Sequence, residues 1–168
     1  MKLSNANIPP RGSVGLLNRR YLLTRYIGSL LALALGLAAL GARAQSTEDS
    51  VKAAVNLLFT GMKTSDAGMI SRSFTDSAIL QTITSAQGVI RDEKVKDFAD
   101  AVGKMTPGDA DERIQFDVVR IDGPLAIVWA PYEFYYKGKY SHKGVDSFQL
   151  VRVNGIWKIQ YLIDTRRK

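Results

Sequence analysis

The stretch LAIVWAPYEFYYKGKYSHKGVDSFQLVRVNGIWKIQYLIDTR, residues Leu125–Arg166, decides the fold of this 168-residue chain. Its β-forming residues and two short turn signals predict three long antiparallel strands. Asn154-Gly155 favours a two-residue type I′ turn, because both central residues of that turn need a positive φ. We therefore expect Val153 to face Ile156, and we count the register of the last two strands from that pair.

Counting outward from this turn assigns side chains to the two faces of the sheet, since they alternate along a strand. One face is predicted to hold His142, Asp146, Phe148, Leu150, Trp157, Ile159, Tyr161 and Ile163. Most of these residues are apolar, with polar groups towards one end. Such a face predicts a hydrophobic core with a ligand pocket beyond it.

The turn at Lys137-Gly138 determines which side chains of the preceding strand reach this face. A two-residue loop places Glu133 opposite His142 and Trp129 opposite Asp146. Lys-Gly suits a type I′ turn, so we prefer this register. Glu133 and His142 would then form either a cross-strand ion pair at the rim of the sheet or an acid/base pair beside Trp129.

A three-residue loop at the same turn gives a different pocket. It places Phe134 opposite His142 and Ala130 opposite Asp146. His142, the only His of the chain, would then lie against an aromatic ring. His142 and Asp146 cannot bond each other in either register, because four residues of strand span about 13 Å.

The net charge of +7 suggests an acidic partner at first, but its distribution removes that suggestion. Six basic residues precede Gln45, whereas every Asp and Glu follows it. From Gln45 onward the charge is 17 basic minus 16 acidic residues, or +1. We therefore expect no nucleic-acid partner, because that attraction needs a basic surface.

The first 44 residues have the pattern of an export signal. A basic segment precedes the apolar run Ile27–Leu40, and Ala42-Arg43-Ala44 provides an A-x-A cleavage site. We expect cleavage after Ala44 and a periplasmic or secreted protein, with membrane contact only through an uncleaved signal. Arg19-Arg20 before Tyr21-Leu22-Leu23 is also consistent with twin-arginine export, although two Arg in a basic leader can be coincidental.

The remaining residues, 45–168, are predicted to form one domain without disulfide bonds, since the chain has no Cys. Apolar residues at helical spacing predict a helix from Ser46 to about Lys63, a short one capped by Asp66, and a third capped by Asp92. We expect strands at Ala78–Ile83, at Val89-Ile90 and from Arg113 to Asp122. Helices first and a long meander last predict an α+β fold with helices on one face of a curved antiparallel sheet.

With this order of predicted helices and strands, the chain resembles the nuclear transport factor 2-like superfamily, the cone-shaped fold of SnoaL-like polyketide cyclases and ketosteroid isomerase. It is most similar to small exported bacterial members, some of them labelled putative lumazine-binding. The resemblance is carried by Ala53–Met62, Ala126–Trp129, Tyr132–Phe134, His142–Gly144, Asp146–Phe148, Gly155–Ile159 and Asp164–Arg166. It implies a pocket between the helices and the concave sheet face, and a homodimer through the convex face. No motif around Tyr132, Asp146 or Tyr161 matches the catalytic groups of ketosteroid isomerase.

These observations leave three functions open. The first is binding of a small, partly apolar molecule by Trp129, Glu133, His142, Asp146 and Tyr161. The second is an isomerase, cyclase or dehydratase that needs no cofactor and uses one of the polar residues as general base. The third is a dimeric interaction module whose cavity is filled by side chains.

Cofactor and metal chemistry is not indicated. The sequence contains no nucleophile elbow, phosphate-binding loop or dinucleotide fingerprint. With one His and no Cys, a zinc site would need carboxylates almost alone, so we expect none.

Overall fold

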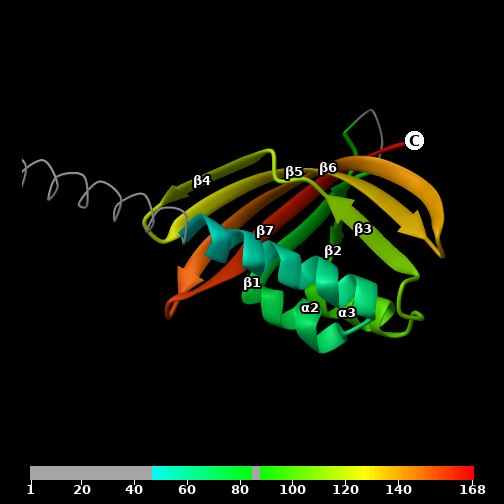
Figure 1. Cartoon of the computed structure of the whole chain (residues 1–168), viewed down its shortest axis with the longest axis horizontal. Coiled ribbons are helices and arrows are strands. Elements are labelled where there is room, and N and C mark those ends of the chain that lie inside the picture. The colour runs from blue at the N-terminus through cyan, green and yellow to red at the C-terminus, as the bar shows by residue number, and fades with distance from the viewer. Residues whose placement is uncertain (1–46, 85–87) are drawn as a thin grey trace, which may run out of the picture. The chain divides into compact units, whose positions relative to one another are not determined.

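The computed structural model describes residues 47–84 and 88–168, which belong to one compact unit. The predicted export signal at residues 1–44 lies outside the described residues. The described chain begins with a helix over residues 47–64, followed by the helices α2 (Ala67–Ser73) and α3 (Val95–Gly103). All three lie on one side of a curved sheet (Figure 1). No helix among the described residues is long and apolar enough to cross a membrane.

A predicted side-chain cap begins α2, whereas the cap predicted for α3 is not the one observed. Asp66 caps α2, as predicted, and its carboxylate accepts a hydrogen bond from the backbone N–H of Met69 at 2.8 Å. The predicted cap of α3 is wrong. Lys94 occupies that position without a side-chain bond, because Asp92 is drawn into a strand, where it accepts a hydrogen bond from the Gln81 amide.

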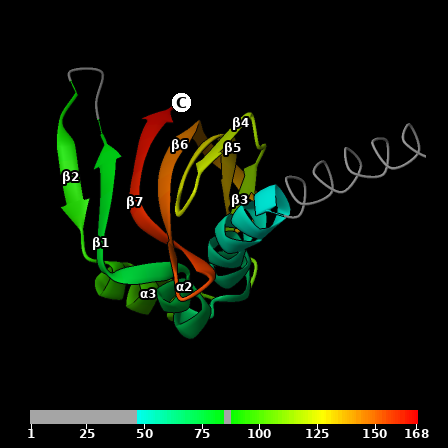
Figure 2. The ribbon, with the colours of Figure 1, turned by 90° about the vertical axis from the view of Figure 1, so that its left-hand side faces the viewer.

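Seven strands form a single sheet in the order β2-β1-β7-β6-β5-β3, with β4 also paired to β5. The strands are β1 (Phe74–Ile83), β2 (Ile90–Glu93), β3 (Ala110–Ile114), β4 (Val118–Asp122), β5 (Leu125–Tyr136), β6 (Lys139–Val153) and β7 (Ile156–Arg167). All neighbours are antiparallel except β1 and β7, which run parallel. The α+β arrangement is confirmed, with a mixed rather than wholly antiparallel sheet. Its concave face carries the helices (Figure 2).

The strand expected from Arg113 to Asp122 is divided in two. Residues 115–117 interrupt it, and β3 and β4 pair with different halves of β5. The interruption is tied to β5, because the backbone N–H groups of Gln115 and Asp117 donate to the carbonyls of Pro131 and Trp129. One long strand thus carries two short partners along the same edge.

Both predicted two-residue turns are confirmed. Lys137 and Gly138 have φ of 52° and 74°, and Asn154 and Gly155 have φ of 51° and 84°. Tyr136 pairs with Lys139, and Val153 pairs with Ile156, as expected.

Each hairpin also contains an irregularity that the sequence analysis missed. Ser141 is an extra residue in β6, since Tyr135 pairs with Tyr140 but Phe134 pairs with His142. Gln160 is an extra residue in β7, since Leu150 pairs with Ile159 but Gln149 pairs with Tyr161. A one-residue bulge reverses the facing of every side chain beyond it relative to the partner strand.

The core lies between the helices and the middle of the concave face. Phe148, Leu150 and Ile159 contribute from β6 and β7, and the N-terminal helix contributes Val51 and Val55. These five side chains have no exposed surface. The core fills one part of the concave face and leaves the rest for a cavity.

Candidate functional site

A cavity of about 260 Å³ lies between the helices and the concave sheet face. Its helix side is apolar and consists of Leu58, Phe59, Met62, Phe98, Val102 and Met105, with Ala101 between them. The sheet side carries all the charged groups of the lining, together with apolar residues. Its polar residues are Thr82, Glu93, Glu112, Tyr132, His142, Asp146, Asp164 and Arg166, and its apolar ones are Leu80, Ala110, Phe134 and Leu162. A cavity with one apolar wall and one wall rich in polar groups suits a small amphipathic molecule.

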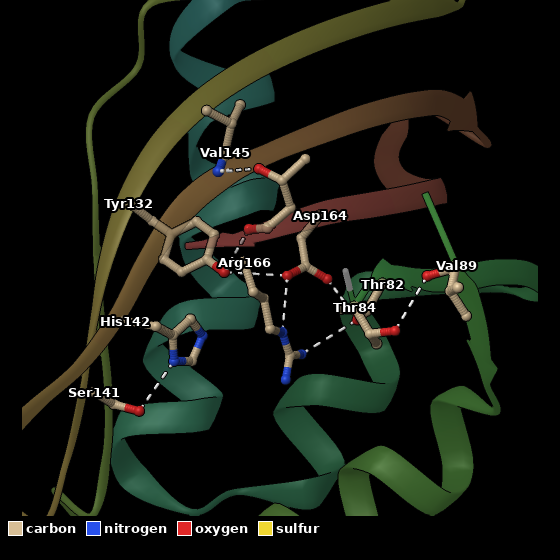
Figure 3. A network of polar contacts seen from close by, with 10 residues as sticks. Thr82, Thr84, Val89, Tyr132, Ser141, His142, Val145, Asp164 and Arg166 are labelled. Atoms are coloured by element: carbon tan, nitrogen blue, oxygen red, sulfur yellow. Dashed lines mark hydrogen bonds and ion pairs between the residues drawn. The ribbon is translucent and has the colours of Figure 1, made fainter. Parts of the chain in front are cut away.

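Asp164 on β7 is the centre of a hydrogen-bonded network (Figure 3). The Thr82 hydroxyl donates to Oδ1 at 2.6 Å, and the Arg166 guanidinium donates to Oδ2 at 3.1 Å. Arg166 also donates through Nη2 to the Thr82 hydroxyl at 3.2 Å. Asp164 is therefore a carboxylate whose charge is matched by its own neighbours.

Tyr132 reaches this network by passing over Gly144 of β6, which has no side chain. Its hydroxyl lies 3.1 Å from Oδ2 of Asp164 and 3.0 Å from the Thr165 carbonyl oxygen. The ring passes over Gly144, where a Cβ would lie 2.7 Å from Tyr132 Cε1 and 1.7 Å from the Thr165 oxygen. Burial and the Asp164 charge raise the pKa of Tyr132, so its hydroxyl remains a proton donor.

Among the described residues that line the cavity, Asp146 on β6 is the one with a buried polar atom that has no hydrogen-bond partner. Only 3% of its surface is exposed, and its Oδ2 meets no hydrogen-bond donor among the described residues. Glu112 on β3 lines the same cavity, and its carboxyl group interacts with that of Asp146, so the pair retains a proton that a lone carboxyl group would lose. Burial raises the pKa of Glu112 to about 7, and burial together with the Glu112 charge raises that of Asp146 well above its ordinary value.

His142 lines one side of the cavity. Its ring lies 5.1 Å from that of Phe134 and 5.7 Å from that of Tyr132, and its Nδ1 lies 3.0 Å from the Ser141 hydroxyl. Burial and the positive charge of Arg166 lower the pKa of His142. A neutral imidazole is therefore the form present at neutral pH.

Of the five predicted ligand-binding residues, His142 and Asp146 line the cavity. Trp129 and Glu133 do not, because the bulge at Ser141 moves them to the outer face. Trp129 pairs with Ser147 and is 46% exposed, and Glu133 pairs with Lys143 instead of His142. The preferred pairing of Glu133 with His142 is thus wrong, although the two-residue turn behind it is correct.

Tyr161 is displaced by the second bulge. It was predicted to face Phe148, but the extra residue Gln160 gives that place to Leu162. Tyr161 instead points to the outer face and donates its hydroxyl to the Gln81 side chain at 2.7 Å. The same shift brings Asp164 and Arg166 into the cavity.

Six polar residues of the site were not predicted, namely Thr82, Glu93, Glu112, Tyr132, Asp164 and Arg166. Two of them, Asp164 and Arg166, lie two residues apart on β7 and form an ion pair at 3.1 Å. The sequence did not indicate Glu112 as a site residue, because the strand that carries it was expected to begin only at Arg113. Within residues 47–84 and 88–168, no group of three or more His, Asp or Glu is arranged to hold a metal ion.

Comparison with known proteins places the chain in a family. Residues 46–161 match the model of the family described as "Putative lumazine-binding". No curated protein matches the chain.

Solved structures support the fold. A nuclear transport factor 2-like protein of unknown function from Shewanella baltica OS155 has a TM-score of 0.59 at 14% identity, covering 73% of this chain and 95% of that one. A ketosteroid isomerase-like protein from Erwinia carotovora atroseptica SCRI1043 has a TM-score of 0.54 at 16% identity, covering 72% and 96%. The chain therefore belongs to the family described as putative lumazine-binding, and its fold is that of the nuclear transport factor 2-like superfamily.

Proposed function

We propose that this protein binds a small, partly apolar molecule in the concave-face cavity, with the polar group of the ligand at Asp146. The observation that carries this proposal is the buried Asp146 oxygen that has no donor among the described residues. An unmatched buried carboxyl group costs stability, and a ligand that bonds it would recover that cost. The apolar helix wall opposite would hold the remainder of the molecule.

Native mass spectrometry of the protein purified from the cells that make it tests this proposal. We expect a mass excess that disappears on denaturation. An excess equal to the mass of a lumazine would identify the ligand named by the family description. The Asp146→Leu variant should lose the excess, whereas Glu133→Gln on the outer face should retain it. A protein that carries no excess and binds nothing from an extract of its own cells contradicts the proposal.

A proton-transfer enzyme is a second candidate, favoured by the carboxyl pair of Glu112 and Asp146. A carboxyl group with a pKa of about 7 can both accept and donate a proton at neutral pH. Conversion of cyclohex-3-en-1-one to its conjugated isomer tests this chemistry, because a base removes a proton from one carbon and returns it to another. Rates that Asp146→Asn does not change would exclude the pair as the base.

We also propose that the protein is exported and dimeric. Export is supported by the basic leader, the apolar run Ile27–Leu40 and the A-x-A site at Ala44. An N-terminus at Gln45 in the purified protein would establish cleavage. A homodimer is supported by apolar side chains on the outer sheet face, including Leu125, Ile127 and Trp129, each 45–47% exposed.

A further inference from the structure

The charges that face the cavity are out of balance. Among the described residues, four carboxyl groups line it from β2, β3, β6 and β7, and the helices contribute no charged group. The acidic residues are Glu93, Glu112, Asp146 and Asp164, and Arg166 is the one cation in this part of the chain that lines the cavity. Arg166 forms its ion pair with Asp164. The carboxyl groups of Glu112 and Asp146 thus have no ion pair with any Lys or Arg of the described residues.

Without a ligand, one proton shared by Glu112 and Asp146 offsets only part of this excess negative charge. It neutralises one carboxyl group and leaves the other as a buried anion. A neutral ligand that accepts a hydrogen bond from the proton leaves the same anion buried. An ammonium group, by contrast, supplies both the charge and the N–H donors that two carboxylates need.

The side chains around the carboxyl pair also suit a ligand in which a cationic group is attached to an apolar body. Three rings of the same cavity form a continuous group, with Phe134 and Tyr132 both packed on the neutral ring of His142. Aromatic faces attract cations in desolvated sites. The helix wall supplies Phe59 and Phe98 for an apolar body.

We propose that the cavity binds a small primary or secondary amine as its ammonium ion, seated between Glu112 and Asp146. This inference rests on the proposed function, since it assumes that the cavity is the ligand site. The ammonium replaces the proton shared by the two carboxyl groups, and that proton passes to solvent. No covalent bond forms or breaks. The cavity of about 260 Å³ limits the body of the amine to the size of a single ring with a short chain.

Isothermal titration calorimetry with three compounds of one shape tests the charge of the ligand. The compounds are 2-phenylethylamine, 2-phenylethanol and 3-phenylpropionate. We expect the amine to bind about tenfold or more tightly than the alcohol, because charge-assisted hydrogen bonds are the stronger kind. The propionate should not bind. Titrations in two buffers of different ionisation enthalpy should show proton release with the amine alone.

The pH dependence provides an independent readout. Amine affinity should rise between about pH 5 and pH 8, because the carboxyl pair loses its proton over that range while the amine remains charged. The other titratable or charged groups that face the pair are Glu93, Tyr132, His142, Asp164 and Arg166. Tyr132 stays protonated because its pKa is raised, and His142 is neutral by about pH 7 because its pKa is lowered, so neither changes charge in the upper part of this range.

The variants Glu112→Gln and Glu133→Gln make the same chemical change on opposite faces of the sheet. Glu112→Gln should weaken amine binding by about tenfold and leave the alcohol within about twofold, since it removes a charge without changing shape. Glu133→Gln should alter neither, and circular dichroism should show both variants folded.

Equal affinities for amine and alcohol, or an amine affinity unchanged by Glu112→Gln, would overturn the cationic ligand while leaving the cavity as a binding site. Absence of amine binding would also overturn it. Only a failure of the native mass measurement as well would remove the proposed function.

Discussion

Asp146 and Asp164 lie directly opposite each other on β6 and β7, yet their surroundings differ in kind. Asp164 is satisfied by Thr82, Tyr132 and Arg166, and all of its partners come from the protein. Asp146 faces another carboxyl group, that of Glu112. Two acids on adjacent strands thus have different environments, one matched by hydrogen-bond donors of the protein and the other facing a second acid.

The carboxyl pair should make the protein less stable as pH rises. The pKa of Glu112 is raised by burial from 4.5 to about 7, so the native state holds its proton more tightly than the unfolded chain. The resulting stabilisation is complete below the unfolded value and is lost as pH rises through about 7. We expect the free energy of unfolding to fall by roughly 1–3 kcal/mol between about pH 5 and pH 8.

Urea unfolding at several pH values measures this fall. Glu112→Gln should reduce it by about half or more, because one titrating group of the pair is gone. Glu133→Gln should leave the profile unchanged. A stability that rises over the same range would contradict the inferred protonation of the pair.

Gly144 should be the least replaceable glycine of the sheet. An added Cβ would lie 1.7 Å from the Thr165 carbonyl oxygen, which is backbone and cannot move aside. Gly144→Ala should therefore cost about 3 kcal/mol or more, or prevent folding. Gly138→Ala is the control, since its Cβ meets nothing within 4 Å and only its φ of 74° opposes it. That control should cost about 1 kcal/mol in thermal unfolding.

At the scale of elements, the two short helices differ in their first residues. Asp66 caps α2, whereas Lys94 provides no cap for α3. Asp66→Ala should lower the free energy of unfolding by about 1 kcal/mol, and Lys94→Ser should raise it by several tenths to about 1 kcal/mol. Chemical denaturation of both variants tests this. Equal effects of the same sign would show that the caps do not control these helices.

At the scale of the whole molecule, the outer sheet face should form the dimer contact. Trp129 is central to this face. Leu125 and Ile127 lie on the same strand and the same face, and Ile163 on β7 pairs with Ser147, the β6 partner of Trp129. Trp129→Lys should weaken dimerisation by about 2 kcal/mol or more, as loss of a large aromatic anchor does. Ile156→Lys is the control, since Ile156 is 65% exposed but lies at a hairpin turn. Sedimentation equilibrium measures both.

Most of the local structure follows from short sequence patterns. Both hairpin turns, the Asp66 cap, the order of helices before strands and the inward face of β6 follow from short patterns. They could be predicted because turn geometry, capping and side-chain alternation act over a few neighbouring residues. His142 and Asp146 are therefore in the cavity, as their strand predicted.

The other residues that join them depend on long-range packing. Two extra residues, Ser141 and Gln160, turn Trp129, Glu133 and Tyr161 outward. The bulge at Gln160 also turns Asp164 inward. Glu112 reaches Asp146 only because β3 folds back along β5. A bulge has no reliable local signature, since it is set by how two strands pack and twist against the rest of the sheet. Local patterns thus determined the strands and turns of this protein, and long-range packing determined which residues line its cavity.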